Sequence, residues 1–234
     1  MTTTSDLPAD FPGSIRLALP GEILDLLESP DDASARDHFA STVAELFSSL
    51  DTDRRRLMVE GLMGWRANAL GRGQLMQGFV ALPAGASQGG VTFDGQVVWQ
   101  VIAGVVPVPV TGEIDAGEIV SRYLGQQVDP ATAYVESFPT RMGWGAGLLT
   151  TVPLLSDPDQ TPGLAERGFP GRLGIALAVA APVDAPYGLL VIGLCLDGET
   201  TVDLGSMVAY IAGQSELADA PVAEETQWRH RQQS

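Results

Sequence analysis

The longest apolar run, residues 173–196, constrains the fold more than any other part of the chain. It is long enough to cross a bilayer, but Pro182, Asp184 and Pro186 lie in its middle. A charge and two prolines at the centre of a membrane helix would be costly. Two strands joined by a short turn explain the run better. We therefore predict an antiparallel hairpin, with strands over 172–181 and 188–196, and no membrane insertion.

Further segments have the length and apolar composition of strands. Most are near-continuous apolar runs and not clean alternations, a pattern that indicates a sheet covered on both faces. A shorter segment at the start alternates polar and apolar residues before Pro20 and Gly21. The predicted strands are residues 14–19, 74–82, 96–106, 133–139 and 145–155.

Four segments carry the three- and four-residue apolar spacing of amphipathic helices. They cover residues 31–50, 51–70, 115–125 and 204–217. Asp115 and Glu118 form a capping box for the third segment, and Gly125 ends it. The expected buried residues are Phe39, Val43, Leu46, Phe47 and Leu50 in the first helix and Leu57, Leu62, Trp65 and Ala69 in the second.

These elements predict one α/β (α+β) domain, an αβα sandwich with a mainly antiparallel sheet of about six or seven strands. We place the domain at residues 14–217. Residues 1–13 are expected to be a flexible N-terminus, and the polar, unpatterned residues 218–234 a disordered tail.

Composition excludes several classes of function. The chain has 29 acidic and 13 basic residues, a formal charge of −16. Such a charge disfavours binding to nucleic acid or to anionic membrane surfaces, because such binding needs clustered cations on the protein. All basic residues are arginine, a bias that suggests a high-GC, actinobacterial genome. Cys195 is the single cysteine, and no signal-peptide pattern opens the sequence, so we expect a cytoplasmic protein.

One short motif suggests an enzyme. Gly85, Ser87 and Gly89 match G-x-S-x-G, the nucleophile elbow of hydrolases. An elbow needs a helix after the serine and a histidine later in the chain, but the following residues favour a strand. His38 precedes the serine, and His230 lies in the polar tail. We therefore expect no catalytic residue, no metal and no cofactor, and keep a hydrolase using Ser87 as the third hypothesis.

Two features are candidates for partner binding. Gly205, Ala209 and Gly213 form a small-residue stripe on the last helix, which would let another helix approach closely. Arg141 and Trp144 lie in a turn between two predicted strands and could form a binding surface. The structural alternatives are a helix packed on its own sheet and an ordinary hairpin with its tryptophan in the core.

The order of these elements resembles the PsbP-like superfamily, whose members are αβα sandwiches around an antiparallel sheet. The resemblance rests on the segments IRLALPGEILDLL, IDAGEIVSRYLG, ESFPTRMGWGAGLL and DLGSMVAYIAGQSEL, within residues 14–217. It implies a binding or adaptor role without a common active site. The chain differs from secreted members in having no signal or lipobox cysteine. In class and size it is also similar to the type VII secretion chaperones, which clasp helical substrates.

Together these observations favour a non-catalytic protein-binding adaptor, chaperone or immunity-type factor, with a protein partner or a second copy of the chain. The alternative is a small-molecule or lipid binder with a pocket between sheet and helices. A pocket of several hundred Å³ lined by apolar groups would favour the ligand, and a large exposed apolar patch would favour the protein partner.

Overall fold

The main sheet has seven antiparallel strands in the order β2-β3-β6-β10-β9-β8-β7. The computed structural model describes residues 15–20, 23–82, 85, 87–88, 91–92, 97–108, 133–153, 172–183, 185–196 and 198–217. The strands are β2 (Ile23–Asp25), β3 (Met76–Leu82), β6 (Val97–Pro107), β7 (Tyr134–Thr140), β8 (Gly143–Pro153), β9 (Arg172–Ala181) and β10 (Tyr187–Cys195). The predicted fold class, an α+β sandwich around a mainly antiparallel sheet, is confirmed.

The long apolar run forms the predicted hairpin of β9 and β10. Leu189 pairs with Ala180 and Cys195 with Gly174 along the ladder. Both strands lie in the interior of the sheet, which explains why their sequences are apolar on both faces. None of the helices in the described part of the chain combines the length and apolar composition of a membrane-spanning helix.

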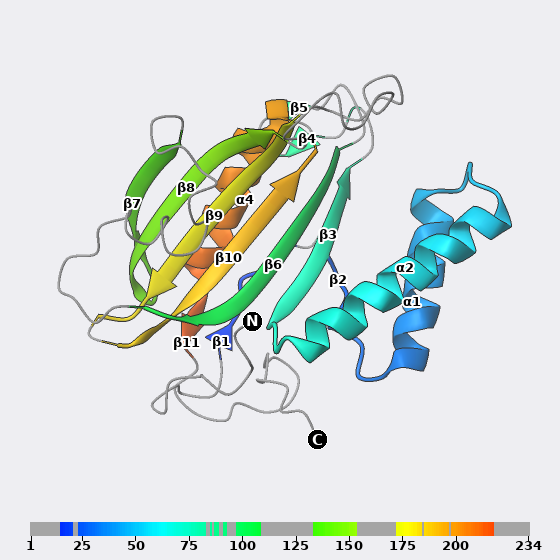
Figure 1. The fold of residues 1–234 in the computed structure, drawn as a ribbon, viewed down its shortest axis with the longest axis horizontal. Coiled ribbons are helices and arrows are strands. Elements are labelled where there is room, and N and C mark those ends of the chain that lie inside the picture. The colour runs from blue at the N-terminus through cyan, green and yellow to red at the C-terminus, as the bar shows by residue number, and fades with distance from the viewer. Residues whose placement is uncertain are drawn as a thin grey trace.

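Helix α4 (Thr201–Gln214) covers one face of the sheet, where it packs against β8, β9 and β10. Figure 1 shows it lying behind these strands. Alternate residues of each strand point toward it and form the largest core cluster, which includes the fully buried Trp99. The indole Nε1 of Trp99 donates a hydrogen bond of 3.0 Å to Thr200 Oγ1, just before the helix.

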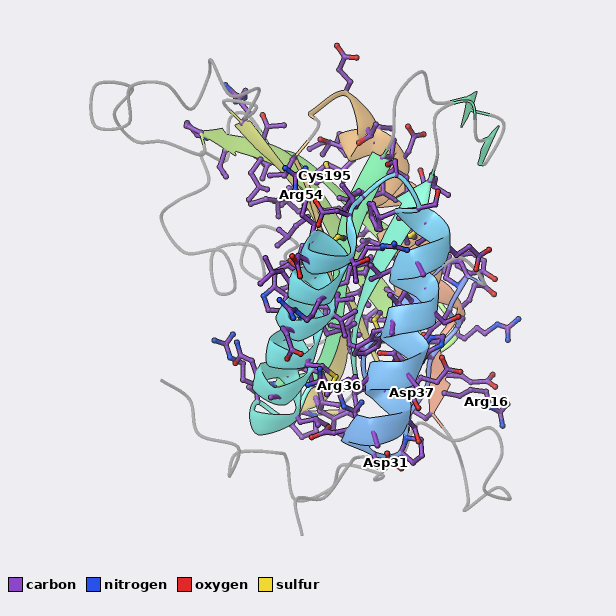
Figure 2. All side chains as sticks on the ribbon, turned by 90° about the vertical axis from the view of Figure 1, so that its right-hand side faces the viewer. Arg16, Asp31, Arg36, Asp37, Arg54 and Cys195 are labelled. Carbon is purple, nitrogen blue, oxygen red and sulfur yellow. The ribbon has the colours of Figure 1, made fainter. Side chains whose placement is uncertain are left out.

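Helices α1 (Asp32–Leu46) and α2 (Thr52–Gly71) form a helical hairpin beside β2 and β3. They lie side by side with the sheet behind them (Figure 2). Their core is separate from that of α4 and includes Leu26, Phe39, Val43 and Val59, with Phe79 of β3 packed against it. The sheet therefore carries helices on opposite sides at different ends.

The predictions of which residues are buried in the first two helices were wrong in part. The first helix ends at Leu46 and not at residue 50, and the Leu46 side chain is 45% exposed. In α2 the Leu57 side chain is 68% exposed, whereas Arg66 and Ala69 are buried. The reason is tertiary: each helix buries a narrow stripe against the other, and only part of the remaining apolar surface reaches the sheet.

The first predicted strand has a partner that the sequence pattern could not reveal. β1 (Ile15–Arg16) pairs with β11 (Glu216–Leu217), which follows α4, so the two ends of the domain are joined outside the main sheet. Strand β2 was not predicted. The predicted helix over 115–125, the N-terminal segment 1–13 and the tail 218–234 lie outside the described residues.

The Asp31 carboxylate caps α1. Its Oδ1 accepts a hydrogen bond of 2.8 Å from the Ser34 backbone N–H. This bond lowers the pKa of Asp31 below its ordinary value. A lowered folded-state pKa means that the cap stabilises the hairpin fully above the unfolded-state pKa and is lost as pH falls through the folded-state pKa.

We therefore expect the stability difference between wild type and Asp31→Ala to be constant near neutral pH and to shrink as pH falls below about 4. Urea unfolding of both proteins across this pH range measures it. Asp31→Asn is the control, because asparagine caps without titrating. A difference that is independent of pH would show that the charged form of the cap contributes nothing.

Candidate functional site

A half-enclosed cavity of about 760 Å³ lies between the helical hairpin and the sheet. Its wall is almost wholly apolar, and a few polar groups accompany the apolar side chains. We call it the hairpin cavity. It is lined by Ile23, Leu24, Glu28, His38, Thr42, Val43, Leu46, Phe47, Met58, Gly61, Leu62, Trp65, Phe79, Ala81, Leu82 and Val98.

Helical and strand periodicity place these residues together. His38, Thr42 and Leu46 are four residues apart along α1 and thus lie on one face. On the sheet, Phe79 and Ala81 point to the same side of β3 because they are two residues apart. Ala81 pairs with Val98 of β6, so Val98 continues the apolar surface across the ladder.

A buried arginine anchors the hairpin at one end of α2. The Arg66 side chain is only 3% exposed and forms an ion pair with Asp32 through Nε at 3.0 Å. Its two terminal nitrogens donate to the carbonyl oxygens of Leu26 at 2.6 Å and Ser29 at 2.9 Å. Arg66 thereby ties α2 to the start of α1 and to the segment that follows β2.

An aromatic pair makes a second contact between hairpin and sheet. The rings of Trp65 on α2 and Phe79 on β3 are stacked, with centroids 4.7 Å apart and planes at 23°. Trp65 remains 46% exposed, so its ring forms part of the mouth of the cavity as well as its wall. Arg66 therefore ties α2 to the segment that follows β2, and the aromatic pair joins α2 to β3 at the wall of the cavity.

The charges of the wall are few. Among its described residues, the only ionisable side chains are Glu28 and His38. Arg36, on the outer side of α1, is engaged in an exposed ion pair with Glu60 of α2. Hydrogen bonding within this pair raises the pKa of Arg36 and lowers that of Glu60. The charges of Arg36 and Arg66 are thus balanced by carboxylates, and neither arginine lines the cavity.

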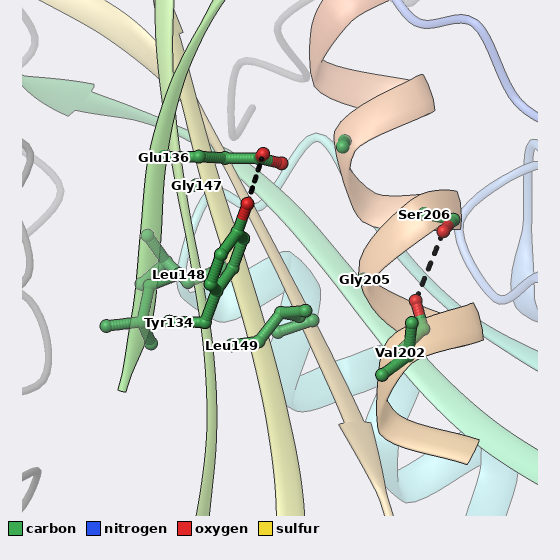
Figure 3. A pocket seen from close by; sticks show the side chains of 11 residues that line it. Tyr134, Glu136, Gly147, Leu148, Leu149, Val202, Gly205 and Ser206 are labelled. Atoms are coloured by element: carbon green, nitrogen blue, oxygen red, sulfur yellow. Dashed lines mark hydrogen bonds between the residues drawn. The ribbon is translucent and has the colours of Figure 1, made fainter. Parts of the chain in front are cut away.

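A second hollow of about 490 Å³ lies between α4 and strands β7 and β8 (Figure 3). Tyr134 and Glu136 of β7 stand on one side, and Ser206 of α4 on the other. The Tyr134 hydroxyl donates a hydrogen bond of 3.1 Å to the Glu136 carboxylate, which raises the pKa of the tyrosine. Ser206 donates to the carbonyl oxygen of Val202 in its own helix. These polar groups are therefore satisfied within the chain.

The small-residue stripe of the last helix faces its own sheet. A Cβ atom on Gly205 would lie 2.3 Å from the Leu149 side chain, and one on Gly213 would lie 3.9 Å from Phe138. Both glycines are buried, and Ala209 lies at the edge of the second hollow. The expectation that Gly205, Ala209 and Gly213 seat a partner helix is thus corrected: the stripe faces the chain's own sheet, and Gly205 lets α4 approach Leu149 of β8 closely.

The other candidate pair is divided between the two faces of the sheet. Arg141 is exposed, and its guanidinium lies 3.6 Å from Glu216 of β11, beyond the end of α4. Trp144 is half-buried and packs with the cluster of Ala146 and Leu148 on the face opposite α4. Arg141 and Trp144 therefore do not form one binding surface.

Ser87 lies in β4 (Ser87–Gln88), which pairs with β5 (Val91–Thr92) in a small separate hairpin. The element that follows it is a strand and not the helix of a nucleophile elbow. His38 lies on α1, and His230 is outside the described residues. Within the described residues, no group of three or more histidine, cysteine, aspartate or glutamate side chains is arranged to hold a metal ion.

No sequence pattern identified the residues of the hairpin cavity as a site. Helical spacing predicted that Leu46, Phe47, Leu62 and Trp65 are ordinary core positions. One sequence feature could have revealed them, the number of large apolar residues. Both helices carry more of these residues than a narrow helix–helix contact can bury.

Comparisons with known proteins found no relative of this chain. No family model matches the chain, and neither a curated protein nor a solved structure matches it. The similarity to the PsbP-like superfamily therefore stays a prediction from the order of elements.

Proposed function

We propose that this protein binds an apolar small molecule in the hairpin cavity and has no catalytic function of its own. The observation that carries the proposal is a cavity of about 760 Å³ with a nearly continuous apolar wall. Ligand sites typically enclose about 300–1,000 Å³ and combine apolar walls with a few polar groups. Its position between sheet and helices is that of the ligand pocket which the sequence left as an alternative.

Protein binding, as an adaptor, chaperone or immunity-type factor, is the second proposal. It is supported by the exposure of Leu46, Leu57 and Trp65 on the helical hairpin, because exposed apolar side chains in one region mark interaction surfaces. We rank it second because Leu46 and Trp65 line the cavity, and a ligand in the cavity would cover part of both. A cytoplasmic location and an actinobacterial source remain parts of this proposal.

Two glycines of α2 allow a matched test. A Cβ atom on Gly61 or on Gly64 would meet no other atom within 4 Å, but only Gly61 lines the cavity. We expect Gly61→Phe to fill part of the cavity and to weaken binding of the uncharged apolar dye N-phenyl-1-naphthylamine about tenfold or more. Gly64→Phe should bind the dye as wild type does. Dye fluorescence titrated with each protein measures the affinities.

Both substitutions change helix propensity equally, so a difference between them reports the cavity. Equal affinity of the two variants, or no dye binding by wild type, would refute the ligand proposal. Native mass spectrometry of the protein purified from its own host then separates the two proposals. A small added mass that Gly61→Phe abolishes would support the ligand, whereas a stoichiometric protein companion would support the adaptor.

A further inference from the structure

We infer that the ligand of the hairpin cavity is an apolar organic cation, such as an amine or quaternary ammonium on a hydrophobic body. This inference rests on the proposed function, and it specifies the class of molecule that the cavity selects. It is carried by two features of the wall: its aromatic rings, and the sign of its charge.

The aromatic part of the wall is built from Phe47, Trp65 and Phe79. Trp65 and Phe79 are already stacked on each other, so their rings are held in place before a ligand arrives. The face of an aromatic ring attracts cations, and tryptophan does so most strongly. Because Trp65 is half exposed at the mouth, a cationic group at the surface can reach its ring while the apolar body fills the interior.

The charge of the cavity wall is opposite in sign to that of a cationic ligand. Glu28 is the one carboxylate among the described lining residues, and no arginine is among them. The chain as a whole carries a formal charge of −16, whose field attracts cations and repels anions. Among the ionisable lining residues an anionic headgroup would find only His38, whereas a cation would meet the carboxylate of Glu28.

The rival possibility is an anionic ligand, for which Arg55 would be the binding group. Arg55 lies on α2 one turn before Met58, and its buried Nε has no hydrogen-bond partner within the described structure. Arg55 does not line the cavity. If the ligand were anionic, this guanidinium would be the group that binds its headgroup.

The test compares octyltrimethylammonium, 1-octanol and octanoate, which share the same apolar chain, as competitors of N-phenyl-1-naphthylamine on the full chain. At low ionic strength we expect the ammonium compound to bind about three- to tenfold more tightly than octanol, in line with a cation–π contact. Octanoate should bind most weakly. Added salt should reduce the differences.

Three variants identify the cause. Glu28→Gln and Trp65→Leu should each reduce the preference for the ammonium compound while octanol still binds. Glu45→Gln is the control, because Glu45 is an exposed carboxylate of α1 that does not line the cavity. It should leave the preference unchanged.

Equal binding of octanol and the ammonium compound would overturn the inference and leave the proposed function intact. So would tightest binding of octanoate, especially if Arg55→Gln abolished it. If wild type did not bind the dye at all, the proposed function itself would fail, and the inference with it.

Discussion

Replacing Arg66 with alanine is expected to lower the free energy of unfolding of the helical hairpin by about 2–4 kcal/mol. The Arg66 side chain is 3% exposed and donates to two backbone carbonyls as well as to Asp32. Its loss leaves the buried carbonyl oxygen of Leu26 and the part-buried carbonyl oxygen of Ser29 without this donor. The hairpin has few other attachments to the sheet, so α1 and α2 should open locally.

Amide hydrogen exchange measures this effect element by element. In Arg66→Ala we expect faster exchange over residues 32–71 and unchanged protection in β9 and β10. Arg36→Ala is the matched control: Arg36 also pairs with a carboxylate across the two helices, but its side chain is 47% exposed. Exposed pairs contribute about 0–1 kcal/mol. Similar effects of the two substitutions would show that Arg66 is not the anchor of the hairpin.

Replacing Gly193 with alanine is expected to destabilise the domain by about 2 kcal/mol. The added Cβ on β10 would lie 2.6 Å from Leu204 Cδ1 and 2.7 Å from Val208 Cγ2 of α4. Both of these side chains are fully buried, so they have no space into which to move. The helix would have to shift away from the sheet, and contacts of the main core would be lost.

Gly104 in β6 is the control for this prediction. It lies in a neighbouring strand of the same sheet, but a Cβ atom there would meet nothing within 4 Å. Gly104→Ala should therefore change the free energy of unfolding by less than about 0.5 kcal/mol. Urea denaturation followed by far-ultraviolet circular dichroism measures both variants. Equal destabilisation would indicate that glycine is needed in these strands for a reason other than the contact with α4.

The antiparallel sheet could be predicted from the sequence because its strands are recognisable from local apolar runs and turn residues. Pro182 and Pro186 divide the apolar run, and the strands on either side pair with each other because so short a turn brings them together. The capping residue Asp31 is similarly local, since its carboxylate needs only the amide three residues later. Both features depend on neighbours in sequence, and the structure confirms the predicted hairpin.

The candidate binding residues could not be placed in this way. A stripe of Gly205, Ala209 and Gly213 indicates close approach of another element, but not which one. In the structure that element is the chain's own sheet, with Leu149 seated against Gly205. Arg141 and Trp144 are close in sequence, yet the alternation of side chains across the sheet sends Trp144 to the face opposite α4.

The sequence alone thus determined the fold class, the central hairpin of strands and the amphipathic character of the helices, because periodicity and turn residues act over a few positions. Only the tertiary structure decided which apolar side chains are buried and which surround a cavity. The hairpin cavity exists because Arg66 and the Trp65–Phe79 pair attach α1 and α2 beside the sheet, and these contacts join residues far apart in sequence.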